Sequence, residues 1–143
     1  MRNTPKRLLL GALLALSVGS ANAMGAAGLL TGGANKLEPI TLSSGMPLAS
    51  APYMLESGKY YAIDIVCDGS AELAISGSEF FRNVWIDEVV INDIELRPLG
   101  MDSLEFDDEG TATIKFVAIR PGTYEVRIPG TTGETQKAVF TIQ

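Results

Sequence analysis

The residues of this sequence that are best suited to chemistry are carboxylates, one cysteine and scattered methionines. The 143-residue chain contains no histidine. Histidine is the commonest general base and a ligand of zinc and blue copper, so Ser-His-Asp and Cys-His nucleophile systems and His-ligated metal centres are excluded. A Gly-x-Ser-x-Gly elbow and a Ser-x-x-Lys pair are also absent. We therefore predict that the protein is not an enzyme, and we expect no cofactor.

The densest run of carboxylates, residues 102–110, has a composition suited to a hard cation. Calcium takes 6–8 oxygen ligands, and an EF-hand loop needs glycine at its sixth position. The sixth residue here is Asp107, so the EF-hand pattern fails. The run fits better a strand at 103–107 that enters an acidic hairpin turn at 108–110.

A second acidic group is spread along two neighbouring candidate strands. Its mixed faces are typical of an edge strand that charge protects from association. The methionines do not cluster at a spacing that favours soft copper ligation. Binding of a metal ion through carboxylates or methionines is kept as the alternative function. The residues concerned are Asp87, Glu88, Asp93, Glu95, Met24, Met46, Met54 and Met101.

Cys67 is the only cysteine, so it cannot form an internal disulfide. It follows Ile63 and Ile65 at alternate positions, which predicts that its side chain points into the core as a small apolar group. Pairing with another chain is the alternative.

The first 23 residues have the pattern of a secretory signal peptide. Arg2, Lys6 and Arg7 precede an apolar run from Leu8 to Val18. The small residues at 21–23 then offer a cleavage site after Ala23, and the run is too short to remain as a membrane anchor. We expect Sec-type export to the periplasm, or secretion, and no membrane insertion after cleavage.

Removal of residues 1–23 leaves 8 basic against 17 acidic residues, a formal charge of −9. Binding to nucleic acid needs clustered Lys and Arg, so nucleic acid is excluded as a partner. Acidity of this size also keeps an exported protein soluble. Basic partners and cations stay possible.

The chain beyond the signal peptide reads as strands and not as helices. Residues 24–36 carry four glycines and are expected to form a flexible lead-in to a single domain at 37–143. Short β-branched and aromatic runs then alternate with Gly, Pro, Asn and Asp clusters. The expected strands are 37–42, 59–67, 71–76, 84–91, 94–99, 103–107, 111–119, 122–128 and 136–142.

Several of these runs alternate cleanly between apolar and polar residues, as half-buried strands do. Residues 79–82 allow one helical turn, and no longer segment has a helical period. Seven to nine short strands without intervening helices predict an all-β antiparallel β-sandwich.

Residues 114–130, IKFVAIRPGTYEVRIPG, resemble the strand, Gly-x-Tyr turn and strand that lead into the copper-ligand loop of cupredoxins. The final QKAVFTIQ resembles their closing strand, and Phe81–Val84 resembles their His-Asn-Val element. The resemblance implies a cupredoxin-like Greek key. By spacing, it would place the copper ligands at Arg82, Ile128, Thr131 and Gln136, none of which suits blue copper. In this respect the chain looks more like the exported bacterial members of the fold that lack copper.

Aromatic residues and arginine are enriched where proteins bind one another. Two consecutive phenylalanines cannot both face inward on a regular strand, so one is exposed or both fill the sandwich end around a bend. We interpret the chain as an exported cupredoxin-like binding module that docks on another envelope protein. The loop end near 81–83 and 129–136 is the expected interaction surface. The candidate interaction residues are Phe81, Arg82, Asn83 and Thr131.

Overall fold

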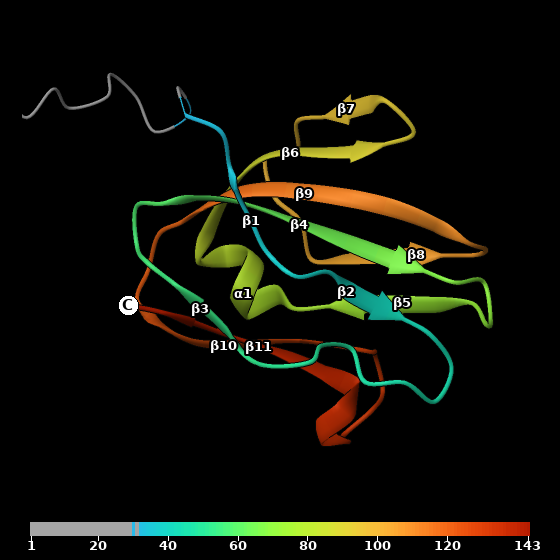
Figure 1. Ribbon diagram of the computed structural model, residues 1–143. Helices are drawn as coiled ribbons and strands as arrows, with labels where there is room; N and C mark the ends of the chain where they lie inside the picture. The colour runs from blue at the N-terminus through green and yellow to red at the C-terminus, as the bar shows by residue number, and fades with distance from the viewer. Residues whose placement is uncertain (1–29, 31) are drawn as a thin grey trace, which may run out of the picture.

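The computed structural model describes Leu30 and residues 32–143. The predicted signal peptide and most of the predicted lead-in lie outside these residues. Two β-sheets pack face to face around one apolar core, with a short helix between the layers (Figure 1). Among the described residues, no helix is long and apolar enough to cross a membrane.

Sheet A contains six strands in the order β1-β4-β9-β6-β7, and β2 also pairs with β4. Sheet B contains five strands in the order β3-β11-β10-β5-β8. The strands of sheet A are β1 Asn35–Lys36, β2 Ile40–Leu42, β4 Tyr60–Cys67, β6 Val84–Ile91, β7 Ile94–Leu96 and β9 Gly110–Ala118. The strands of sheet B are β3 Tyr53–Leu55, β5 Leu73–Ser76, β8 Ser103–Phe106, β10 Gly122–Arg127 and β11 Lys137–Ile142.

The β-sandwich prediction is confirmed, and the structure adds short strands that pair in parallel. β1 and β2 lie parallel to β4, and β3 lies parallel to β11, so both sheets are mixed. Pro39 separates β1 from β2, because proline lacks the N–H that a continuous ladder needs. Asn35 and Lys36, which were expected in the flexible lead-in, form β1.

The core is formed by the apolar faces that the alternation predicted. On β4 the side chains are buried at every second residue from Tyr61 to Cys67, which is 3% exposed, and Ala62 is buried as well. They pack with the inward residues of the paired strand β9 and, across the sandwich, with those of β11. The buried residues of these three strands include Tyr61, Ile63, Ile65, Ile114, Phe116, Ala138, Phe140 and Ile142.

The predicted helical turn is confirmed as α1, Ser78–Arg82, which joins sheet B to sheet A. Gly77 precedes it and lies against β10. A Cβ atom at Gly77 would lie 2.7 Å from Cγ2 of Val126 and 3.0 Å from the carbonyl oxygen of Glu125. Only glycine therefore permits this close approach of α1 to the sheet.

The variant Gly77→Ala is expected to lower the free energy of unfolding by about 1–3 kcal/mol, the usual cost of overpacking. The φ of Gly77 is −168°, so the cost is steric and not conformational. Urea denaturation measures it. Gly100→Ala is the control, because nothing lies within 4 Å of a Cβ there. Equal stability of the two variants would contradict the steric argument.

One connection differs from the sequence prediction. The acidic stretch at 108–110 was predicted as a hairpin turn, but β8 belongs to sheet B and β9 to sheet A, so residues 107–109, which join them, do not form a hairpin. The segment therefore crosses between the sheets. A true hairpin joins β6 to β7, with Asn92 and Asp93 both at positive φ, as a type I′ turn requires.

Candidate functional site

Phe81, the first of the predicted interaction residues, lies in the core and not on the surface. Phe80 and Phe81 are 2% and 5% exposed, and their rings meet edge to face at 5.4 Å. The helical turn of α1 allows both side chains to point inward, which a regular strand would not. The prediction of Phe81 as a contact residue is therefore wrong, and both rings fill the sandwich as the alternative held.

Arg82 and Asn83 lie at the end of the sandwich where β10 begins. Arg82 is exposed, with a long 4.0 Å ion pair to Glu79. The carbonyl oxygen of Asn83 accepts hydrogen bonds from the backbone N–H groups of Ile119 and Arg120. These bonds fix the start of β6 to the connection that enters β10.

Thr131 lies beyond the opposite end of β10. Its hydroxyl donates to the carbonyl oxygen of Ile128 at 2.6 Å, and its carbonyl oxygen accepts from Arg127 at 2.9 Å. Six residues of extended strand span about 20 Å, so the length of β10 separates Thr131 from Asn83. The two parts of the predicted interaction surface therefore lie at the two ends of β10.

The structure instead presents an apolar cleft at the open side of the sandwich. The cleft has a volume of about 310 Å³ and lies between β6 and β7 of one sheet and β8 of the other. A second cleft of about 260 Å³ continues from it, and Ile91 and Leu104 line both. We call the two together the edge groove. Its apolar half is lined by Val89, Ile91, Leu96, Pro98, Met101 and Leu104.

Exposed apolar side chains lie beside this half of the groove. Ile94 and Leu96, on the edge strand β7, are 63% and 48% exposed, and Leu99 is fully exposed. Contiguous exposed apolar surface of this kind marks sites where proteins bind one another. The sequence reasoning missed this surface, because it assigned 94–99 to a single strand. Pro98 and Leu99 in fact follow the end of β7.

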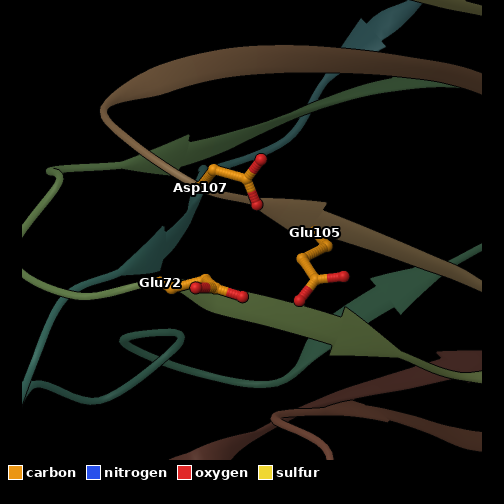
Figure 2. A group of neighbouring side chains, drawn as sticks. All are labelled: Glu72, Glu105 and Asp107. Carbon is orange, nitrogen blue, oxygen red and sulfur yellow. The ribbon is translucent and has the colours of Figure 1, made fainter.

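The other half of the edge groove is acidic. Glu105 and Asp107 line it, and with Glu72 they form a group of three exposed carboxylates (Figure 2). One oxygen of each lies within 4.8 Å of the others. Figure 2 places Glu105 on β8, Asp107 just after it, and Glu72 at the start of β5. We call this group the carboxylate triad.

More carboxylates surround the triad at this end of the sandwich. Gly69 packs closely on Asp108 and Glu109, which brings the β4–β5 turn against the β8–β9 connection. Of the eight basic residues that the structure describes, seven form ion pairs, and none of these pairs includes a carboxylate of this end. The acidic end is therefore open to a cationic ligand. It comprises Asp68, Glu72, Glu105, Asp107, Asp108 and Glu109.

Asp68 of the acidic end is held in its ionised form by local hydrogen bonds. Bonds from the Ser43 and Ser70 side chains, and from the Ser70 backbone N–H, lower its pKa from 3.8 to about 2. A lowered pKa contributes stability that is present above the unfolded-state value and is lost as the pH falls through the folded-state value. The contribution of Asp68 to stability is therefore lost as the pH falls from about 4 to about 2.

The variant Ser70→Ala is expected to raise the pKa of Asp68 toward its ordinary value. It removes the hydroxyl that bonds to the carboxylate and that also accepts the backbone N–H of Ser44 at 2.8 Å. A pH titration of the carboxyl carbon by NMR measures the change. Ser50→Ala, at an exposed position in another loop, is the control. An unchanged Asp68 pKa in Ser70→Ala would contradict the assignment.

The second acidic group of the sequence forms a charge network on the outer face of sheet A. Glu88 is 5% exposed and contacts Lys115 at 2.6 Å and Arg97 at 2.9 Å. A β-bulge between Ile86 and Glu88 places Asp87 beside Arg97 at 2.9 Å. β6 lies between β9 and β7, so it is not the edge strand that the sequence predicted.

Tyr60 extends this network from the neighbouring strand β4. Its hydroxyl donates to Asp87 at 2.7 Å. Burial and then this hydrogen bond raise the pKa of Tyr60, so the phenol stays protonated throughout the physiological range. Each buried member of the network thus has a partner of opposite charge or a hydrogen bond, as a structural role requires.

Comparison with known proteins shows which solved structures share this architecture. No family model and no curated protein sequence matches the chain. Among solved structures, it is similar to multicopper oxidases from Pseudomonas thermotolerans and Pseudomonas parafulva. Their TM-scores are both 0.54, with 17% and 18% identity over 77% and 76% of this chain. It is also similar to a copper nitrite reductase from Nitrosomonas europaea, with a TM-score of 0.52 and 16% identity over 66% of this chain.

The fold is cupredoxin-like. The chain spans only about a third of each of these proteins, 30%, 30% and 33%, so the likeness concerns one domain of a larger enzyme. Sequence identities below 20% show that the fold is shared, but they do not show that the activity is shared.

This cupredoxin-like domain does not fit a blue-copper centre. Arg82 lies at the end where β10 begins, whereas Ile128 and Thr131 follow the other end. Blue copper needs two histidines and a cysteine in one trigonal set. The four positions offer none of these side chains, and Cys67 is buried on β4.

Proposed function

We propose that the chain is an exported, copper-free binding module that docks on another protein of the cell envelope through the edge groove. The observation that carries this proposal is the apolar half of the groove, where a cleft of about 310 Å³ adjoins the exposed side chains of Leu96 and Leu99. Burial of such side chains in an interface is favourable by about 25 cal/mol per Å² of apolar surface.

The residue types of the chain support a role in binding. The sequence has no histidine, and the one buried carboxylate among the described residues, Glu88, is paired with two basic side chains. Export is proposed from the signal-peptide pattern alone. It predicts that protein purified from the periplasmic fraction begins at Met24, which intact-mass measurement can test.

Site-specific photocrosslinking in the source organism tests the docking surface. A photoreactive phenylalanine analogue replaces Leu96 or Leu99 in the full chain, and replaces Ile119 as the control. Leu96 and Ile119 are 48% and 50% exposed, so the two positions are matched in accessibility. We expect one discrete adduct from Leu96 and Leu99 and none from Ile119. The same adducts from all three positions, or none from any, would reject the groove as the docking surface.

A second candidate function is the binding of a hard cation, which the carboxylate triad favours. Three oxygens within 4.8 Å of one another suit the 2.3–2.6 Å ligand distances of calcium. On this alternative, calcium at 100 times its Kd stabilises the protein by about 2.7 kcal/mol, a shift of several degrees in Tm. Glu105→Gln should abolish the shift and Glu38→Gln, an exposed carboxylate outside the triad, should retain it. No shift in the unaltered protein would reject this function.

A further inference from the structure

Within residues 32–143, β8 pairs with a neighbouring strand on one side only. It pairs with β5 from Ser76↔Ser103 to Leu73↔Phe106 and is the last strand of sheet B. The edge groove borders β8, since Ser103, Leu104, Glu105 and Phe106 line it. An unpaired strand edge of this kind is a template for one more strand, because backbone hydrogen bonds can form along its length.

The side chains of β8 alternate in a way that defines a matching strand. Leu104 and Phe106 pack against the core, while Ser103 and Glu105 are exposed. Directly opposite residues of paired strands share a face. A strand added to β8 would therefore direct one set of side chains into the groove beside Val89 and Ile91, and the other set outward beside Glu105.

The charge on the outward face of β8 determines which side chains are favoured on the outward face of an added strand. Glu105 belongs to the carboxylate triad, and no basic residue in the described part of the chain forms an ion pair with the triad. A lysine or arginine in the added strand would meet this charge, whereas an acidic residue would be repelled. A second copy of this chain carries a net charge of the same sign, so a basic partner is favoured over self-association.

We infer that the edge groove binds an extended segment of a partner protein, with alternating apolar and Lys/Arg residues, as an additional strand on β8. The inference rests on the proposed docking function and specifies its mode. The apolar residues occupy the groove, the backbone pairs with β8, and the basic residues lie along the carboxylate triad.

The probe is a synthetic, end-capped nine-residue peptide of alternating lysine and valine. It is titrated into the full chain labelled with ¹⁵N. We expect amide shifts confined to β7, β8 and the 97–102 connection, and slower hydrogen exchange at β8 amides that face the groove. Peptides with glutamate in place of lysine, or with the valines contiguous, should bind at least about ten-fold more weakly.

Two charge-reversal variants separate local recognition from general attraction. Glu105→Lys and Glu38→Lys change the net charge equally, and both side chains are exposed. We expect Glu105→Lys to weaken peptide binding by about ten-fold and Glu38→Lys by less than two-fold. Equal weakening by both would overturn the inference in favour of non-specific charge attraction.

The remaining outcomes are also decisive. Shifts outside the groove, or the absence of binding, would overturn strand addition. Concentration-dependent broadening of β7 and β8 signals without peptide would assign the groove to a second copy of the chain. Crosslinks from Leu96 and Leu99 together with a peptide that does not bind would leave the docking function standing and reject only its mode.

Discussion

Phe80→Ala is expected to lower the free energy of unfolding by about 3–5 kcal/mol, a large part of the 5–15 kcal/mol typical of a domain. The Phe80 ring is 2% exposed and stacks on Phe140 with centroids 4.1 Å apart. It also meets Phe116 edge to face at 5.5 Å. These contacts connect α1 to both sheets, so the cavity cannot close without moving one of them.

Urea denaturation followed by the fluorescence of Trp85 measures this loss. Met54→Ala is the control, since Met54 is 59% exposed and its truncation should change stability by no more than about 0.5 kcal/mol. A loss below 1 kcal/mol for Phe80→Ala would show that the cavity collapses.

Phe81 is buried beside Phe80. Truncation of Phe81 is therefore expected to weaken the binding of a partner only by destabilising the fold.

Lys115→Met is expected to lower the free energy of unfolding by about 2 kcal/mol at neutral pH. Removing one partner of a buried ion pair costs about 3–5 kcal/mol, and the remaining Arg97 and partial exposure of Lys115 reduce this cost. The hydrogen bond to Glu88 raises the pKa of Lys115. A raised pKa contributes stability below the unfolded-state value of 10.5 that is lost as the pH rises through the folded-state value.

A double-mutant cycle tests this account of the pair. Glu88→Leu combined with Lys115→Met removes both charges and leaves Arg97 with Asp87 and Glu95. Buried ion pairs replaced by apolar residues often cost little, so the double variant should be within about 1 kcal/mol of the unaltered protein. If the double variant were less stable than Lys115→Met alone, the buried charge of Glu88 would not be the cause of the loss.

The long strands of the sandwich could be predicted because each buries only one face. The alternation that ends at Cys67 predicted which side of β4 is buried, and the same argument succeeded for Ile114 and Phe116 on β9. A strand of three residues offers little alternation by which to recognise it. β3 was missed for this reason, since Tyr53–Leu55 shows one period only and depends on β11 for its pairing.

The candidate site was less predictable because it depends on which strands lie at the edges. The sequence indicated that residues 84–91 and 94–99 were strands, but pairing alone shows that β6 is internal and β7 is not. The resemblance of Phe81–Val84 to a His-Asn-Val element placed Arg82 at one loop end with residues 129–136, whereas the structure places Arg82 where β10 begins and Thr131 beyond its other end. Position in a β-sandwich is set by long-range pairing, which local sequence does not encode.

The place of β11 in sheet B has a consequence for how this chain acquires its fold. β11 lies between β3 and β10, and its pairing of Phe140 with Tyr53 joins residues 87 positions apart. The strands of sheet B therefore cannot all pair until residues 137–142 have left the ribosome, even if the rest of the chain has already folded. Contacts this distant in sequence slow folding, so the newly made chain should remain open to chaperones for longer than a helical chain of equal length.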